Sequence, residues 1–308
     1  MSKSASVEMP VDDVVEAIGD CDPNATREAL DPITDDGAVT REAVEAAVSD
    51  TSKLLATAET RVELARHACE DAVDAADPVD DLDVVGVRLD GFAERLSAVE
   101  SRAADLRPDL TVPADLSERP RAAYELATEL RAVATAAQGV ATTADDLSFD
   151  IDEFRSWLQR PTRRHEEFGE DIDLVRNSAE ELAEAVTDWP SDAVDPAARW
   201  ADATMRARVL SLLVSDLRAE LRDLRVLAER DGTEVPSDVP QRLAGIESRV
   251  AEIESELELR SESAWRERFR DDLASLDDSL AAFDHPVEWG AVELALDDCR
   301  PATSSDTE

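Results

Sequence analysis

An apolar stripe with alternating spacings of three and four residues runs through positions 123–189 and limits the possible folds more than any other feature. Its members are Ala123, Leu126, Leu130, Val133, Ala137, Val140, Ala144, Leu147, Ile151, Phe154, Leu158, Phe168, Ile172, Val175, Ala179, Leu182, Val186 and Trp189. Residues at this spacing share one face of a helix, and that face is stable in water only when another helix packs on it. The stripe therefore predicts long helices that pair through their apolar faces.

The same pattern recurs in the rest of the chain, divided by caps and breakers. We expect helices over 40–77 and 82–106, a third from 115 or 117 to 147, and a fourth from 150 to the end of the stripe. A fifth covers 196–231 and a sixth begins after 237. Thr40 and Asp195 are N-cap residues, Pro78 ends the first long helix, and Gly232 ends the fifth. A short helix opened by Pro286 completes the set.

Three interruptions of the apolar pattern have specific interpretations. Asp150 followed by Glu153 resembles a capping box, so we expect a break at 148–150; one continuous rod is the alternative. Pro161 then lies inside the fourth helix and should kink it. After Leu257 the apolar positions change register, and Trp265 and Phe269 continue as they would after a stutter in one helix.

The predicted fold class is all-α, an elongated antiparallel helical bundle or coiled-coil hairpins of about six long helices. No segment shows the alternation of β-branched residues expected of strands. Four regions follow. Residues 1–39 form an N-terminal tail and short helix, and 40–189 a four-helix antiparallel region. Residues 190–299 form a helical hairpin plus a short helix, and 300–308 a disordered tail.

The net charge of −41 indicates that the protein works in a salt-rich solvent, and it excludes several classes of partner. Asp and Glu number 73 against 32 Lys and Arg, and Lys3 and Lys53 are the only lysines. Such a surface repels itself unless molar salt screens it, and arginine holds geometric ion pairs under those conditions better than lysine. We therefore expect a protein of the cytoplasm of a salt-accumulating microbe. Nucleic acid and anionic membrane surfaces are excluded as partners because both require a basic face.

Targeting and membrane segments are not expected either. Residues 1–10 contain one lysine and no apolar core, unlike a signal peptide. No run approaches eighteen uncharged apolar residues, so we predict no membrane insertion.

The residues of common catalytic and metal sites do not occur at the required spacings. His67, His165 and His285 lack a glutamate three residues earlier, and no Gly-x-Ser-x-Gly turn or glycine-rich phosphate loop is present. Three distant cysteines argue against a disulfide framework and a zinc knuckle. We therefore predict a non-enzymatic protein with no cofactor, no metal and no small-molecule substrate. An enzyme or metal carrier whose site forms only in three dimensions is the alternative.

Two arginine clusters beside aromatic residues are the candidate partner-binding sites. The first contains Arg155, Trp157, Arg160, Arg163 and Arg164, and the second contains Trp265, Arg266 and Phe269. Each could accept an anionic partner, or its arginines could pair with acidic faces of neighbouring helices. The tryptophans could likewise fill wide parts of the core or form a docking patch.

Four phrases carry a family resemblance: TSKLLATAETRVELA at 51–65, WADATMRARVLSLLVSDLRAELRDL at 200–224, AWRERF at 264–269 and PVEWGAV at 286–292. They are similar to haloarchaeal helical proteins labelled "halo transducer protein", whose biochemistry is unassigned. The resemblance implies a cytoplasmic haloarchaeal protein, its label suggests signal transduction, and it supplies no catalytic residues.

These observations lead to two functional hypotheses. The first is a protein–protein interaction scaffold or signal-transduction accessory. The alternative is a self-associating coiled-coil rod that organises the chromosome or the cell. In both, the partner is a protein or another copy of the chain.

Overall fold

The computed structural model describes residues 9–19, 22–106, 119–189 and 195–300. It is all-α and 86% helical, with long packed helices, which confirms the predicted fold class. The expected tails at 1–8 and 301–308 and the corners near 108–117 and 190 lie outside the described residues. No helix in the described ranges is both long and apolar enough to cross a bilayer.

Several predicted helix ends are confirmed by their capping geometry. α1 covers Val11–Ile18, α3 Arg41–Ala76, α4 Asp83–Asp105 and α7 Pro196–Asp231. The amide of Ala43 donates to Thr40 Oγ1 at 3.1 Å, and that of Ala198 donates to Asp195 Oδ1 at 3.0 Å. Gly232 adopts the left-handed conformation (φ 66°) that ends α7.

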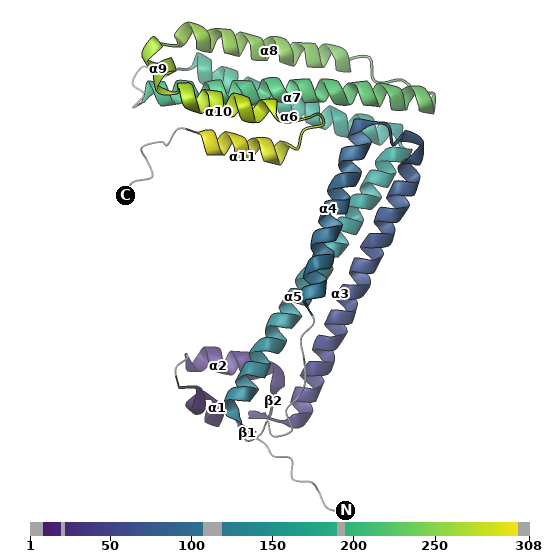
Figure 1. Ribbon diagram of the computed structural model, residues 1–308, viewed down its shortest axis with the longest axis vertical. Helices are drawn as coiled ribbons and strands as arrows, with labels where there is room; N and C mark the ends of the chain where they lie inside the picture. Colours follow the sequence, from purple (N-terminus) through teal and green to yellow (C-terminus); the bar gives the residue numbers. More distant parts are fainter. Residues whose placement is uncertain (1–8, 20–21, 107–118, 190–194, 301–308) are drawn as a thin grey trace, which may run out of the picture. The chain divides into compact units, whose positions relative to one another are not determined.

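The chain divides into two compact units, of residues 1–75 and 89–155 and of residues 76–88 and 156–308. In the first, α4 runs antiparallel to α3 and to α5 (Pro120–Gln159; Figure 1). Arg66 pairs with Glu100 at 2.7 Å, and the Phe92 and Phe154 rings lie 5.5 Å apart. The buried face of these helices includes several alanines: Ala58, Ala65, Ala72, Ala123, Ala127, Ala137 and Ala144.

The N-terminal segment of the first unit contains strands that the sequence analysis did not predict. β1 (Met9–Pro10), β2 (Thr34–Asp35) and β3 (Ala38–Val39) form an antiparallel sheet in the order β1-β3-β2. Asp36 and Gly37, both with positive φ, form the β2–β3 turn, which suits an Asp-Gly hairpin. The sheet, α1, α2 (Pro23–Leu30) and the 3₁₀ turn η1 (Asp31–Ile33) pack on the first turns of α3 and α5 around Leu30 and Ile33.

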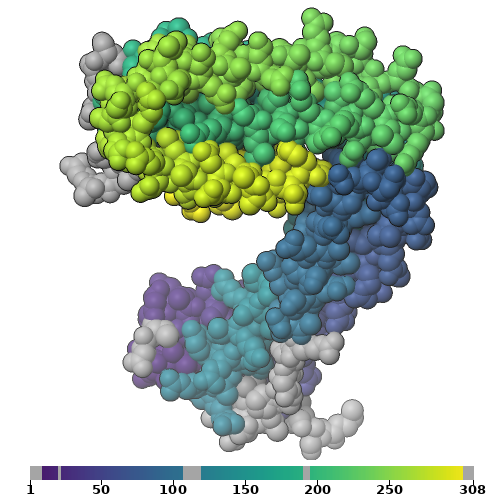
Figure 2. All heavy atoms as spheres, turned by 45° about the horizontal axis from the view of Figure 1, so that its top comes forward, coloured from purple at the N-terminus to yellow at the C-terminus, as the bar shows by residue number. Residues whose placement is uncertain are grey.

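The second unit is built on three mutually packed helices, α6 (Pro161–Thr187), α7 and α8 (Val239–Arg260; Figure 1). The predicted region 40–189 grouped α6 with the preceding helices, whereas α6 packs on α7 and α8. The 3₁₀ turn η2 (Asp77–Val79) and the first turn of α4 also belong here. α9 (Ser263–Arg268), α10 (Arg270–Ala281) and α11 (Trp289–Cys299) follow, and α10 and α11 lie along α7 (Figure 2).

The predicted break at 148–150 is wrong, because α5 is continuous through it. Leu147 and Ile151, on either side, are both fully buried, so core packing keeps the segment helical. Ser148 Oγ donates to the carbonyl of Ala144 at 2.9 Å, and Asp150 pairs with Arg95 of α4 at 2.7 Å instead of acting as a cap.

The kink predicted at Pro161 is also wrong: α5 ends at Gln159, and Pro161 is the first residue of α6. Proline is favoured there because its missing N–H would have no helical partner. The predicted stutter after Leu257 is also wrong, because the helix ends there and new helices follow. α8 ends at Arg260, Ser261 is extended, and α9 and α10 are separate helices. Pro286 lies three residues before α11 and does not open it.

Candidate functional site

α11 runs antiparallel along α7 and is attached to it by polar contacts at both ends. Near its start, the buried Asp216 carboxylate of α7 accepts hydrogen bonds from the Val287 amide at 2.8 Å and from Trp289 Nε1 at 3.0 Å. His285 Nδ1 lies 3.1 Å from the same carboxylate. Just beyond its end, Arg300 Nε pairs with Asp202 Oδ1 at 3.2 Å. These contacts fix α11 against α7 by its two ends.

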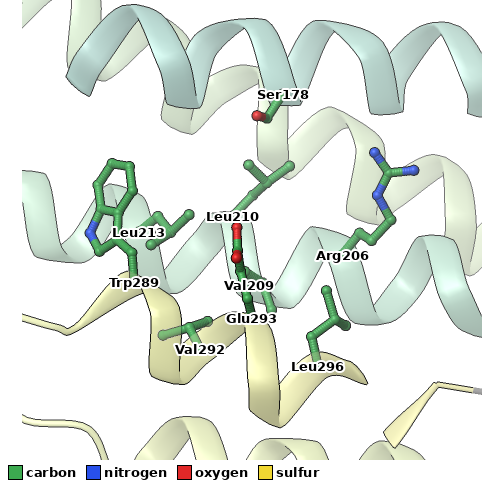
Figure 3. A pocket seen from close by; sticks show the side chains of 9 residues that line it. All are labelled: Ser178, Arg206, Val209, Leu210, Leu213, Trp289, Val292, Glu293 and Leu296. Atoms are coloured by element: carbon green, nitrogen blue, oxygen red, sulfur yellow. The ribbon is translucent and has the colours of Figure 1, made fainter. Parts of the chain in front are cut away.

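Between these attachments the packing leaves a pocket of about 220 Å³ (Figure 3). We call it the α11 groove, and its lining comes from α6, α7 and α11: Ser178, Arg206, Val209, Leu210, Leu213, Trp289, Val292, Glu293 and Leu296. Leu210, Val292 and Leu296 are buried, so the floor is apolar. The groove can therefore receive an apolar group.

Two opposite charges border the groove without neutralising each other. The described residues provide no ion-pair partner for Arg206 of α7 or for Glu293 of α11. By contrast, Arg208 on α7 donates to Asp277 at 2.7 Å and to the Leu273 carbonyl at 2.8 Å. The groove therefore presents one cation and one anion beside an apolar floor.

An exposed apolar side chain on α6 extends this surface beyond the pocket. Leu174 lies one helical turn before Ser178, on the same face of α6, and is 55% exposed. An exposed leucine beside an apolar pocket is typical of a docking surface for another protein.

The size of the groove bears on the kind of ligand. Sites for cofactors and drug-sized molecules usually measure about 300–1,000 Å³, so the groove suits one or two anchoring side chains better. In the part of the chain that the structure describes, no three His, Cys, Asp or Glu side chains are placed to hold a metal ion.

The first predicted arginine cluster is partly internal to the second unit. Trp157 and Arg164 are each 1% exposed. Arg164 Nη1 donates to the carbonyls of Trp157 at 3.1 Å and Leu158 at 2.7 Å, while Nη2 pairs with Asp231 of α7. Arg164 thus binds the last carbonyls of α5, which a helix end leaves unsatisfied.

The other members of that cluster are Arg155, Arg160 and Arg163. Arg155 belongs to the first unit and contacts Asp71 of α3 at 3.7 Å and Asp152 at 3.4 Å. Arg160 is the exposed residue before α6, and Arg163 is half-buried on the first turn of α6.

The second predicted cluster mainly connects α9 to neighbouring helices. The Trp265 ring lies 6.4 Å from that of Trp200 on α7, and Arg266 pairs with Glu258 of α8 at 2.9 Å. Phe269 is buried, with the Arg268 guanidinium 4.6 Å from its ring centroid. These contacts match the alternative in which the arginines pair within the chain, while partner binding at either cluster stays a prediction.

A half-buried group of carboxylates lies where α4, α6 and α7 meet within the second unit. Arg88 of α4 donates to Glu167 of α6 at 2.5 Å and stacks 4.4 Å from the Trp157 ring centroid. Burial, reinforced by Glu167, raises the pKa of Asp171 to about 6. Burial, reinforced by Asp171 and Asp216 and opposed by Arg88, raises the pKa of Glu220 to about 7.

Sequence reasoning missed both the groove and the carboxylate group because each combines residues from distant helices. One local signal was available for the groove. Beside the stripe of α7 that packs on α6 and α8, Val209 and Leu213 widen its apolar arc. A helix with a wide apolar arc requires a further partner, and that partner is α11.

Comparison with known proteins gives no relative for this chain. No protein-family model matches it, no curated protein matches it, and no solved structure matches it.

Proposed function

We propose that the protein is an interaction module, a scaffold or signalling accessory, and that the α11 groove is its docking site. The observation that carries this proposal is the groove itself: an apolar pocket, an exposed leucine beside it and two charges without ion-pair partners. Binding energy at protein interfaces is concentrated in a few anchors that fill such pockets. An apolar side chain of the partner would enter between Leu210 and Val292.

The charge pattern supports a salt-rich cytoplasm as the setting. Forked ion pairs connect separate segments of the second unit, such as that of Arg268, whose Nη1 and Nη2 donate to the two oxygens of Asp195 at 3.0 and 2.8 Å. Two parallel hydrogen bonds retain their geometry where screening weakens a simple charge attraction. The similarity of four sequence phrases to proteins labelled "halo transducer protein" favours a signalling role within this proposal.

Site-specific photo-crosslinking in the native cells tests the docking site. A photoreactive amino acid replaces Leu174, beside the groove, and in a control chain it replaces Leu259, which is 85% exposed on α8. We expect a protein adduct from position 174 and not from 259. The Ser178→Trp substitution, which fills the groove, should abolish that adduct, with circular dichroism verifying that the variant is folded.

Two results would contradict the proposal. One is the absence of any adduct from position 174. The other is an adduct that persists in the folded Ser178→Trp variant, because such an adduct would not depend on the groove.

A further inference from the structure

The charges at the α11 groove are complementary to each other, yet they do not pair within one chain. Arg206 lies one helical turn from Leu210 on α7. Glu293, on α11, lines the same groove as these residues (Figure 3). No described residue forms an ion pair with either side chain. One surface therefore presents a positive and a negative group at separate points along an apolar groove.

Such a surface is complementary to the same surface on a second copy related by a two-fold rotation. In a symmetric dimer the same patch is used twice, so that residue i of one copy meets residue j of its partner and the reverse. Rotation about an axis between Arg206 and Glu293 brings each guanidinium to the carboxylate of the other copy. We propose that the α11 groove binds a second copy of this chain in this way, an inference that rests on the proposed docking function.

The apolar part of the surface fits the same arrangement. The two-fold contact covers Leu174 of both copies, which is otherwise in solvent. Interfaces between identical chains are more apolar at their centre than transient ones, and the floor of the groove supplies that centre. The dimer has two reciprocal Arg206–Glu293 contacts around this centre.

The net charge sets the salt dependence of this dimer. Two chains of −41 each repel at low ionic strength. The Debye length falls from about 8 Å at 0.15 M salt to about 3 Å at 1 M, which removes most of the repulsion. Self-association should therefore strengthen with salt, whereas binding of an oppositely charged foreign protein would weaken.

Sedimentation equilibrium of the full chain and its charge variants tests the proposal. Arg206→Glu places two acidic groups at each contact, and Glu293→Arg places two basic groups there. Each single variant should weaken self-association roughly tenfold or more, because like charges oppose each other at contact. The double variant restores opposite charges and should dimerise about as well as the original chain.

Arg222→Glu and Glu229→Arg, at exposed positions of α7 outside the groove, control for the change in net charge. Both should dimerise like the original chain. Circular dichroism verifies that every variant is folded.

The outcomes separate this inference from the docking proposal. A chain that stays monomeric at high salt, or a double variant that does not recover, overturns the dimer. If the Leu174 adduct then contains a different protein and still depends on the groove, the docking proposal holds without self-association. If neither a dimer nor a groove-dependent adduct is found, both are wrong.

Discussion

The three-helix part of the first unit and the α6–α7–α8 core of the second use the same heptad spacing with different side chains. Alanines such as Ala65 and Ala144 take a larger share of the buried positions in the first, while larger side chains such as Phe168 and Leu217 take a larger share in the second. Among the largest fully buried side chains, the two aromatic residues and the one charged residue all belong to the second unit. The same sequence period therefore builds one core with a larger share of alanine and one with a larger share of bulky side chains.

The two units also differ in where ion pairs and hydrogen bonds join their helices. In the first unit the ion pairs between helices lie at the solvent-exposed edges, as with Arg61 and Asp145, which are 46% and 52% exposed. In the second unit buried groups connect separate segments: Arg164 binds the end of α5, and Asp216 binds the segment before α11. Buried polar groups lose more when a partner is removed than exposed pairs do. The two units should therefore respond to different substitutions.

Truncation of the large core of the second unit should have the largest effect. Leu217 is fully buried on α7, and Leu217→Ala should destabilise the second unit by about 2–5 kcal/mol through lost burial and a residual cavity. Native-state hydrogen exchange of the α6–α8 amides, with denaturant unfolding, measures this loss. Leu174→Ala at an exposed site is the control and should change stability by less than about 0.5 kcal/mol. A loss below about 1 kcal/mol for Leu217→Ala would contradict the comparison.

Enlargement is the corresponding test of the first unit. Ala144 is fully buried on α5, and Ala144→Leu should destabilise the first unit by about 1–3 kcal/mol because the added side chain forces its neighbours apart. The loss should appear in the exchange of α3 and α5 amides. Ala136→Leu, at an exposed position of the same helix, should have little effect. A stabilised Ala144→Leu chain would show that the alanine face is underpacked.

The carboxylate group of the second unit should make its stability depend on pH. Because the folded pKa of Glu220 is raised to about 7, the folded chain binds more protons than the unfolded chain, and stability falls as pH rises from about 4.5 to about 7. Asp171, with a pKa raised to about 6, adds to the fall. Glu220→Gln should therefore stabilise the second unit at pH 8 by about 1–2 kcal/mol, a figure reduced for partial exposure, and change little at pH 4.5.

Thermal unfolding of the Glu220→Gln variant across this pH range checks the sign. Glu229→Gln, at an exposed site on α7, controls for the loss of one negative charge. A variant that gains equally at both pH values would show that packing, and not the charge, explains the effect.

Sequence patterns predicted the helices whose ends are determined locally. Thr40 and Asp195 cap α3 and α7 with their own side chains, and Gly232 supplies a conformation that few other residues adopt. The capping signal at Asp150 failed because burial of Leu147 and Ile151 outweighs it, and burial depends on neighbours far away in the sequence. The Asp36-Gly37 turn was detectable, but strands of two residues are too short to show alternation.

The α11 groove was less predictable from the sequence than the helix ends. Its lining joins α6, α7 and α11, and periodicity identifies which face of a helix is apolar but not which helix covers it. The arginine clusters were visible as clusters, but the direction of each guanidinium depends on the tertiary fold. Arg164 lies next to Arg163 in the sequence and is buried, while Arg160 before it is exposed.

The smallest expected effect is at the exposed edge of the first unit. Arg61 of α3 and Asp145 of α5 lie 3.2 Å apart with both side chains about half exposed, so solvent and salt screen their attraction. Arg61→Ala should cost less than about 1 kcal/mol, and a double-mutant cycle with Asp145→Ala should give a coupling energy that decreases toward molar salt. The Arg95–Asp150 pair at 2.7 Å between α4 and α5 offers a second cycle of similar exposure. If either coupling exceeded about 2 kcal/mol, exposed ion pairs would contribute as much as the apolar face, and the contrast between the two units would have to be abandoned.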